Sequence, residues 1–269
     1  MRNPLSALFW LIVLGGVFHY FLTATGVTNQ SREDMRKAYV EYVRGETAQT
    51  VGERTEAFNK ALELYKNLEE RYQVEFSDGK LFFNIANSYF QLGEYPWATL
   101  YYNRALKLRP RDEKVQHNLK ITHEKLGIDP KEERSVFDKL FFFYSNYSFP
   151  ERMQWFMAFS LVALIFTSTF IWDRKIWMKK VAGATTVLAG VMLLTLGYSH
   201  YIAPIEGVII RSTALYRDAG LQYAKVIDEP VLSGKKVEVL DVLKSGKWLK
   251  ITTPDGHLGY IPGDAIRII

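Results

Sequence analysis

The residue types that most often carry out chemistry are sparse in this chain of 269 residues. It contains no cysteine, which excludes disulfides, thiolate metal sites and thiol nucleophiles. The sequence also lacks a glycine-rich phosphate loop, a His-Glu-x-x-His pair and a Gly-x-Ser-x-Gly elbow. Its five histidines are scattered, at His19, His117, His123, His200 and His257. These features argue against an enzyme.

Two local clusters of candidate groups do not change that expectation. His117 and His123 are six residues apart, which places them about 240° apart around a helix, so they do not converge on a metal ion. Asp255 belongs to an Asp-Gly turn, and Asp264 has no obvious acidic partner. We therefore expect no catalytic residue, no metal and no cofactor.

Two apolar runs instead suggest a membrane protein. Residues 155–172 and 181–198 contain no Asp, Glu, Lys, Arg or His, and each is long enough, at roughly 18–20 residues, to cross a bilayer as a helix. The connector 173–180 is too short to recross the bilayer, and it carries four cations against one Asp. The positive-inside rule makes this connector cytoplasmic. We predict a transmembrane hairpin over 153–201, with both flanking regions on the non-cytoplasmic side.

The N-terminus supports the same orientation. Residues 1–27 have a charged start, an apolar run over 4–22 and small residues at Ala24 and Gly26, as in a secretory signal. The run is also long enough to remain as an anchor, so cleavage stays open. Either outcome exports the region that follows.

Small residues recur every seven positions in the second apolar run, at Gly183, Gly190 and Gly197, with Ala182 and Ala189 alongside. This spacing places them on one helix face, where small residues allow close helix packing in lipid. The stripe can pack the hairpin on itself or receive a span from another protein.

Apolar residues recur at helical spacing over 28–127, with a polar connector over 45–52. This pattern predicts about five helices. The most specific pattern begins at Gly79 and comprises Phe82, Ile85, Ala86, Tyr89, Gly93, Tyr95, Ala98, Tyr102, Ala105 and Pro110. It resembles the 34-residue tetratricopeptide repeat (TPR), here over 79–112. One repeat cannot bury its own face, so we expect a short TPR-like array.

The resemblance implies a groove lined by side chains of the first helix of each repeat. Two phenyl rings beside amide and cationic groups suit an extended or helical peptide, with Asn87 bonding its backbone and the lysines a carboxylate. Alternatively, Asn84 and Asn87 are common repeat residues and the phenyl rings cover an adjoining helix. The groove positions are Lys80, Phe83, Asn87, Phe90, Gln91, Lys114, His117 and Ile121.

Residues 128–152 form a junction crowded with aromatic side chains, especially over 136–149. Aromatic belts lie at the headgroup level, so we predict a short amphipathic helix lying on membrane lipid. An aromatic ligand cage is the alternative.

The C-terminal part, 206–269, has short β-rich runs between Gly, Pro, Asp and Ser turns. The runs Gly-Lys-Trp-Leu-Lys-Ile and Asp-Gly-His-Leu-Gly-Tyr-Ile resemble a bacterial SH3-like (SH3b) barrel. This all-β fold assigns structural roles to Trp248, Gly256, Gly259 and Tyr260. Tyr216, Tyr223 and Trp248 either form an aromatic surface or belong to the core.

The whole order of parts resembles the TPR-plus-SH3 branch of the bacterial aerotolerance-operon (Bat) family, including Gln116-His117-Asn118-Leu119 after the repeat. That resemblance implies a cytoplasmic-membrane protein acting beside von Willebrand A-domain Bat proteins and a MoxR-type ATPase, in oxidative or envelope stress.

Together these features predict a non-enzymatic scaffold that assembles membrane or periplasmic proteins on the periplasmic face of the bacterial inner membrane. The alternative is a module that binds or senses peptidoglycan through the SH3b domain. The net charge of +5 is spread along the chain without a basic block, so no nucleic-acid partner is expected.

Overall fold

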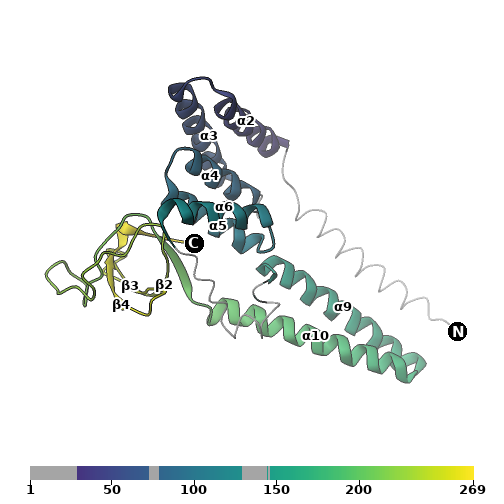
Figure 1. Ribbon diagram of the computed structural model, residues 1–269. Helices are drawn as coiled ribbons and strands as arrows, with labels where there is room; N and C mark the ends of the chain where they lie inside the picture. Colours follow the sequence, from purple (N-terminus) through teal and green to yellow (C-terminus); the bar gives the residue numbers. More distant parts are fainter. Residues whose placement is uncertain (1–28, 73–78, 129–143, 145) are drawn as a thin grey trace. The chain divides into compact units, whose positions relative to one another are not determined.

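The computed structural model describes residues 29–72, 79–128, 144 and 146–269 (Figure 1). The chain divides into two compact units, Met1–Ser77 and Asp78–Ile269. The predicted signal or anchor over 1–27 and the aromatic stretch 136–143 lie outside the described residues.

The first unit contains a pair of helices, α2 (Asn29–Thr47) and α3 (Val51–Arg71). The sequence predicted a connector over 45–52, but α2 continues to Thr47. Gly45 is a packing residue rather than a turn residue, because a Cβ there would lie 2.8 Å from the ring of Phe58. Helix α3 then begins at once, because the Thr50 side chain accepts a hydrogen bond from the Glu53 backbone N–H.

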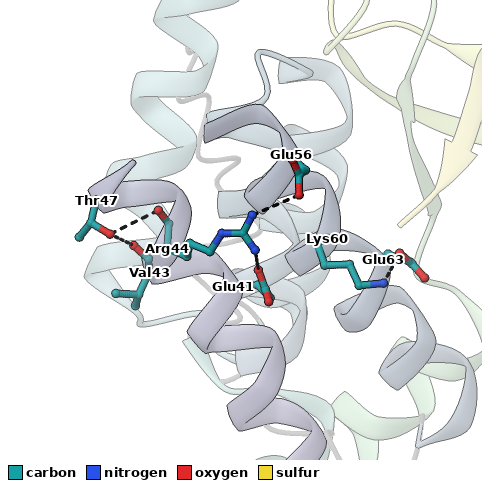
Figure 2. A network of polar contacts seen from close by, with 7 residues as sticks. All are labelled: Glu41, Val43, Arg44, Thr47, Glu56, Lys60 and Glu63. Atoms are coloured by element: carbon teal, nitrogen blue, oxygen red, sulfur yellow. Dashed lines mark hydrogen bonds and ion pairs between the residues drawn. The ribbon is translucent and has the colours of Figure 1, made fainter. Parts of the chain in front are cut away.

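Figure 2 shows a polar network on the surface of this helix pair. Arg44 of α2 pairs with Glu41 of its own helix at 2.9 Å and with Glu56 of α3 at 3.2 Å. Exposed ion pairs of this kind contribute about 0–1 kcal/mol. The pair is therefore held mainly by its buried apolar stripe on α3, which comprises Ala57, Phe58, Ala61, Tyr65 and Leu68. Burial also raises the pKa of Tyr65 above its ordinary value.

The second unit starts with three helices, α4 (Lys80–Gln91), α5 (Tyr95–Leu108) and α6 (Glu113–Leu126). Gly93 adopts a φ of +79°, which lets the chain reverse between α4 and α5. Ala86 and Ala98 have no exposed surface, so the two helices approach closely. The described residues between 29 and 126 thus contain five helices, which matches the predicted helical region.

Two long apolar helices follow, α9 (Phe149–Asp173) and α10 (Ile176–Tyr201), and they lie antiparallel to each other (Figure 1). Ser148 and Glu151 form a capping box at the start of α9. Only residues 174 and 175 separate the helices, so the predicted connector 173–180 is mostly the first turn of α10.

The glycine stripe of α10 does not pack against α9. The buried face of α10 comprises Met178, Ala182, Ala189, Met192 and Thr195. A Cβ placed on Gly183, Gly190 or Gly197 would meet no described atom within 4 Å. The predicted stripe therefore divides, because its alanines Ala182 and Ala189 lie on the buried face of α10 whereas its three glycines do not.

A five-stranded antiparallel sheet in the order β4-β3-β2-β1-β5 ends the unit. One of its faces covers an apolar core that includes Ile209, Leu215, Ile251 and Ile261. No ladder joins β4 to β5 in the described residues, so the sheet is open rather than the predicted closed barrel. Its strands are β1 (Ile205–Ile209), β2 (Lys236–Leu243), β3 (Trp248–Thr252), β4 (Leu258–Pro262) and β5 (Ile266–Ile268).

The helices α4–α6 and the residues that join them make polar contacts with the sheet and with α9. Arg104 of α5 donates to the main-chain oxygen of Ile268 at 2.8 Å. Arg111, just before α6, pairs with Glu151 of α9 at 2.6 Å. The second contact uses the same carboxylate that caps α9.

Replacing Ala98 by Leu should destabilise the helical array, because a fully buried contact between α4 and α5 has no room for three more carbons. Overpacking of this kind costs about 1–3 kcal/mol. Thermal unfolding of the full chain in detergent, followed by circular dichroism, measures the effect. Lys120→Leu, at an exposed position of α6, is the control and should melt close to wild type. Equal melting of the two variants would contradict the close helix approach.

Candidate functional site

The candidate peptide-binding surface lies on α4 and α6, and its two phenyl rings already contact α5. The ring of Phe83 lies 6.1 Å from that of Tyr102, and the ring of Phe90 lies 5.4 Å from that of Tyr95 in an edge-on arrangement. Both phenylalanines stay half-exposed. Each ring therefore packs on the neighbouring helix and keeps part of its surface exposed.

Asn87 is the centre of a hydrogen-bond cluster that ties the three helices together. Its Oδ1 accepts from the hydroxyl of Tyr102 at 2.6 Å and from Nδ2 of Asn118 at 3.0 Å. The amide oxygen is thus used inside the protein, and a ligand would meet the amide nitrogen. This arrangement connects α4 with α6 through Asn87 and Asn118.

The remaining predicted positions differ in exposure. Lys80, Lys114 and His117 are exposed, whereas Gln91 and Ile121 are half-buried. None of the eight predicted positions is buried. The surface therefore offers cations and an imidazole around half-exposed aromatic rings, which is chemistry suited to a peptide that carries a carboxylate.

His123, on a different side of α6 from the surface, is half-buried. Burial lowers the pKa of His123 below its ordinary value, because the protonated ring loses hydration. It is therefore kept as a neutral packing residue rather than a charged ligand-binding group.

The aromatic residues of the sheet also lie differently from their predicted core roles. Trp248 and Tyr260 are half-exposed, on the face opposite the buried Leu249 and Ile261. The rings of Tyr216 and Trp248 meet edge to face at 5.7 Å, and Lys250 Nζ lies 5.9 Å from the centre of the Tyr260 ring. Tyr216 and Trp248 are half-exposed neighbours and Tyr223 is 42% exposed, so none of the three lies in the buried core.

Two glycines of the sheet region have structural reasons, a close approach at Gly259 and a turn at Gly256. A Cβ at Gly259 would lie 2.7 Å from the Tyr216 main-chain oxygen, and Gly256 adopts a φ of +82°. Sequence reasoning missed the roles of Asn118 and of the Tyr102 hydroxyl. Asn118, one position beyond His117 in the motif Gln-His-Asn-Leu, was the available signal.

Comparison with known families agrees with the helix geometry. Residues 79–112 match the model described as tetratricopeptide repeat. A search of curated proteins gave no significant match to the chain. The chain thus carries a TPR repeat, followed by two long apolar helices and a C-terminal five-stranded antiparallel sheet.

The half-buried His123 predicts a pH dependence of stability. Its folded pKa lies below the unfolded value of about 6.5. The neutral form is the one favoured by folding, so its contribution is complete above about pH 6.5. That contribution is lost as the pH falls through the folded pKa, because the unfolded chain then binds the proton more tightly.

Between pH 7.5 and pH 5, the melting temperature of the full chain in detergent should therefore fall more steeply for wild type than for His123→Gln. His117→Gln, at an exposed histidine, is the matched control and should follow wild type. Parallel curves for wild type and His123→Gln would contradict the effect of burial.

Proposed function

We propose that this protein is a non-enzymatic, membrane-anchored adaptor that binds protein partners through its TPR-like helices. The observation that carries this proposal is the TPR repeat over 79–112, a unit that suggests protein–protein interaction, in one chain with two long apolar helices. The first feature supplies a recognition surface and the second a means of anchoring it.

The exposure of the two apolar helices supports the anchoring. None of the most apolar 18-residue window of α9 is buried, and only 22% of the corresponding window of α10 is. Helices in the core of a soluble protein have their apolar surface covered by the rest of the chain. With 25 and 26 residues, α9 and α10 span about 37–39 Å, which exceeds the hydrocarbon thickness of about 30 Å.

The charge distribution supports an orientation with both soluble parts in the periplasm. Arg174, Lys175, Lys179 and Lys180 cluster at the turn between α9 and α10. The positive-inside rule assigns this end to the cytoplasm. The array precedes the start of α9 and the sheet follows the end of α10. Both of these helix ends lie away from the turn, so the array and the sheet would face the periplasm together.

The surface on α4 and α6 suits an extended peptide with an acidic side chain or a free carboxylate. Lys114 and His117 offer positive or hydrogen-bonding groups, while the accessible sides of Phe83 and Phe90 offer apolar contact. The order of modules resembles that of the Bat family, which adds von Willebrand A-domain membrane proteins and a MoxR-type ATPase system as the proposed partners. The same proposal includes a role of the C-terminal sheet as an SH3b-like interaction module.

Site-specific photo-cross-linking tests the adaptor function. A photoreactive phenylalanine at Phe83 or Phe90 should yield discrete adducts with membrane or periplasmic proteins in intact cells, identified by mass spectrometry. Gln116, which faces away from this surface on α6, is the matched control position and should give few adducts. The same yield at all three positions, or none at Phe83 and Phe90, would reject this surface as the partner site.

Peptidoglycan binding is the second candidate function, favoured by the half-exposed rings of Tyr216, Trp248 and Tyr260 beside Lys250. Aromatic rings with a nearby cation suit the stacking and carboxylate contacts of a wall peptide. In the same experiment, a cross-linker at Trp248 that captures wall fragments, with no protein adducts at Phe83 or Phe90, would favour this candidate over the adaptor.

The proposed orientation makes a separate prediction. Protease added to intact spheroplasts should digest both the helical array and the sheet, because both would lie outside the cytoplasm. A short epitope inserted at the turn between residues 174 and 175 should stay protected until the membrane is lysed. Protection of either flanking region in intact spheroplasts would contradict the orientation.

A further inference from the structure

Arg152, in the first turn of α9, is the only charged side chain that is buried among the described residues, with 4% of its surface exposed. Its Nη1 donates to the main-chain oxygen of Thr195 in α10 at 2.9 Å. The guanidinium also lies 5.0 Å from the ring centre of Tyr144 and 5.9 Å from that of Phe149. Its Nε–H is buried and has no hydrogen-bond partner in the described part of the chain.

A buried guanidinium with an unused donor is energetically costly unless an anion compensates it. The neighbouring carboxylate, Glu151, is already engaged at both oxygens. One oxygen pairs with Arg111 at 2.6 Å, and the other accepts from the Ser148 backbone N–H at 2.8 Å. No ion pair joins Arg152 to a described acidic residue, so its counter-charge must come from elsewhere.

The depth of Arg152 indicates the source of that charge. Arg152 precedes Asp173, the last residue of α9, by 21 positions, which corresponds to about 32 Å along the helix. This length is close to the hydrocarbon thickness of about 30 Å. When the end of α9 at Asp173 lies at one boundary of the hydrocarbon, Arg152 lies at the other, beside the phosphates of the outer surface of the bilayer.

The surroundings of Arg152 fit the same depth. Tyr144 meets Tyr198 edge to face at 5.0 Å, and Trp155 stacks on Phe159 at 5.6 Å. Aromatic residues of this kind concentrate at the headgroup level. Phe149, whose ring is near the guanidinium, is itself 44% exposed.

We propose that Arg152 binds the phosphate of an anionic phospholipid at the non-cytoplasmic mouth of the α9–α10 hairpin, an inference that rests on the membrane anchoring proposed above. The planar guanidinium fork matches a phosphate and forms two parallel hydrogen bonds with it. One N–H stays on Thr195 and holds the two helices together, which leaves the unpartnered Nε–H for the phosphate. The cations of the turn, such as Arg174, are exposed and lack this enclosed geometry.

Purified full-length protein in a neutral detergent, titrated with phosphatidylglycerol or phosphatidylcholine, tests the proposal. Phosphatidylglycerol should raise the melting temperature, and native mass spectrometry should detect one retained lipid per chain. Phosphatidylcholine should have a much smaller effect, because its choline group offsets the phosphate charge. In Arg152→Gln, the apparent affinity for phosphatidylglycerol should drop at least tenfold.

Arg174→Gln is the matched control, because it removes the same charge from an exposed position. It should keep the wild-type response to phosphatidylglycerol. Arg152→Lys retains the charge without the fork, so it should fold and bind the lipid more weakly than wild type. This second variant keeps the test decisive if Arg152→Gln does not fold.

Three outcomes would overturn the proposal. The first is an unchanged lipid response in Arg152→Gln or Arg152→Lys, and the second is equal stabilisation by both lipids. The third is no response to either lipid together with an acidic protein that copurifies only when Arg152 is present, which would assign the guanidinium to a protein partner. Failure of the anchoring itself is distinguishable, because the chain would then leave native membranes in an alkaline carbonate wash.

Discussion

The organisation of the chain depends on one constraint. The helices α9 and α10 have apolar surface that the rest of the described protein leaves uncovered. Leu164 of α9 is 52% exposed and Leu194 of α10 is 75% exposed. Exposed apolar surface costs about 25 cal/mol per Å² in water, so a continuous surface of this length favours a lipid environment. The two-residue turn at 174–175 places the start of α9 and the end of α10 at the same end of the hairpin.

Much of this organisation could be predicted because it is encoded in local spacing. Ala57, Ala61 and Tyr65 recur at helical intervals and are fully buried, so the face of α3 follows from its sequence. The small residues Ala86 and Ala98 likewise indicate from the sequence that α4 and α5 approach closely. The two apolar runs likewise needed only their length and their lack of charge.

Features that depend on distant partners could not be predicted. Gly45 looks like a turn residue until Phe58, thirteen positions later, occupies the space beside it. Trp248 could belong to the core or to an aromatic surface on sequence alone, and only the sheet register places Leu249 inward and leaves Trp248 half-exposed. Asn87 had two possible roles, and its internal role depends on Tyr102 and Asn118, which come from two other helices.

The internal role of Asn87 bears on how an adaptor of this size would work. A satisfied polar cluster fixes the relative positions of α4, α5 and α6, so a peptide would meet a preorganised surface and lose little affinity to reordering. The surface is nevertheless short, because a single repeat matches the TPR model. Small interfaces bind weakly and transiently. Confinement of both partners to one membrane would raise their effective concentration, as a linker does between two binding modules. The apolar hairpin would then contribute to recognition as well as to localisation, since it compensates for the small area of the array.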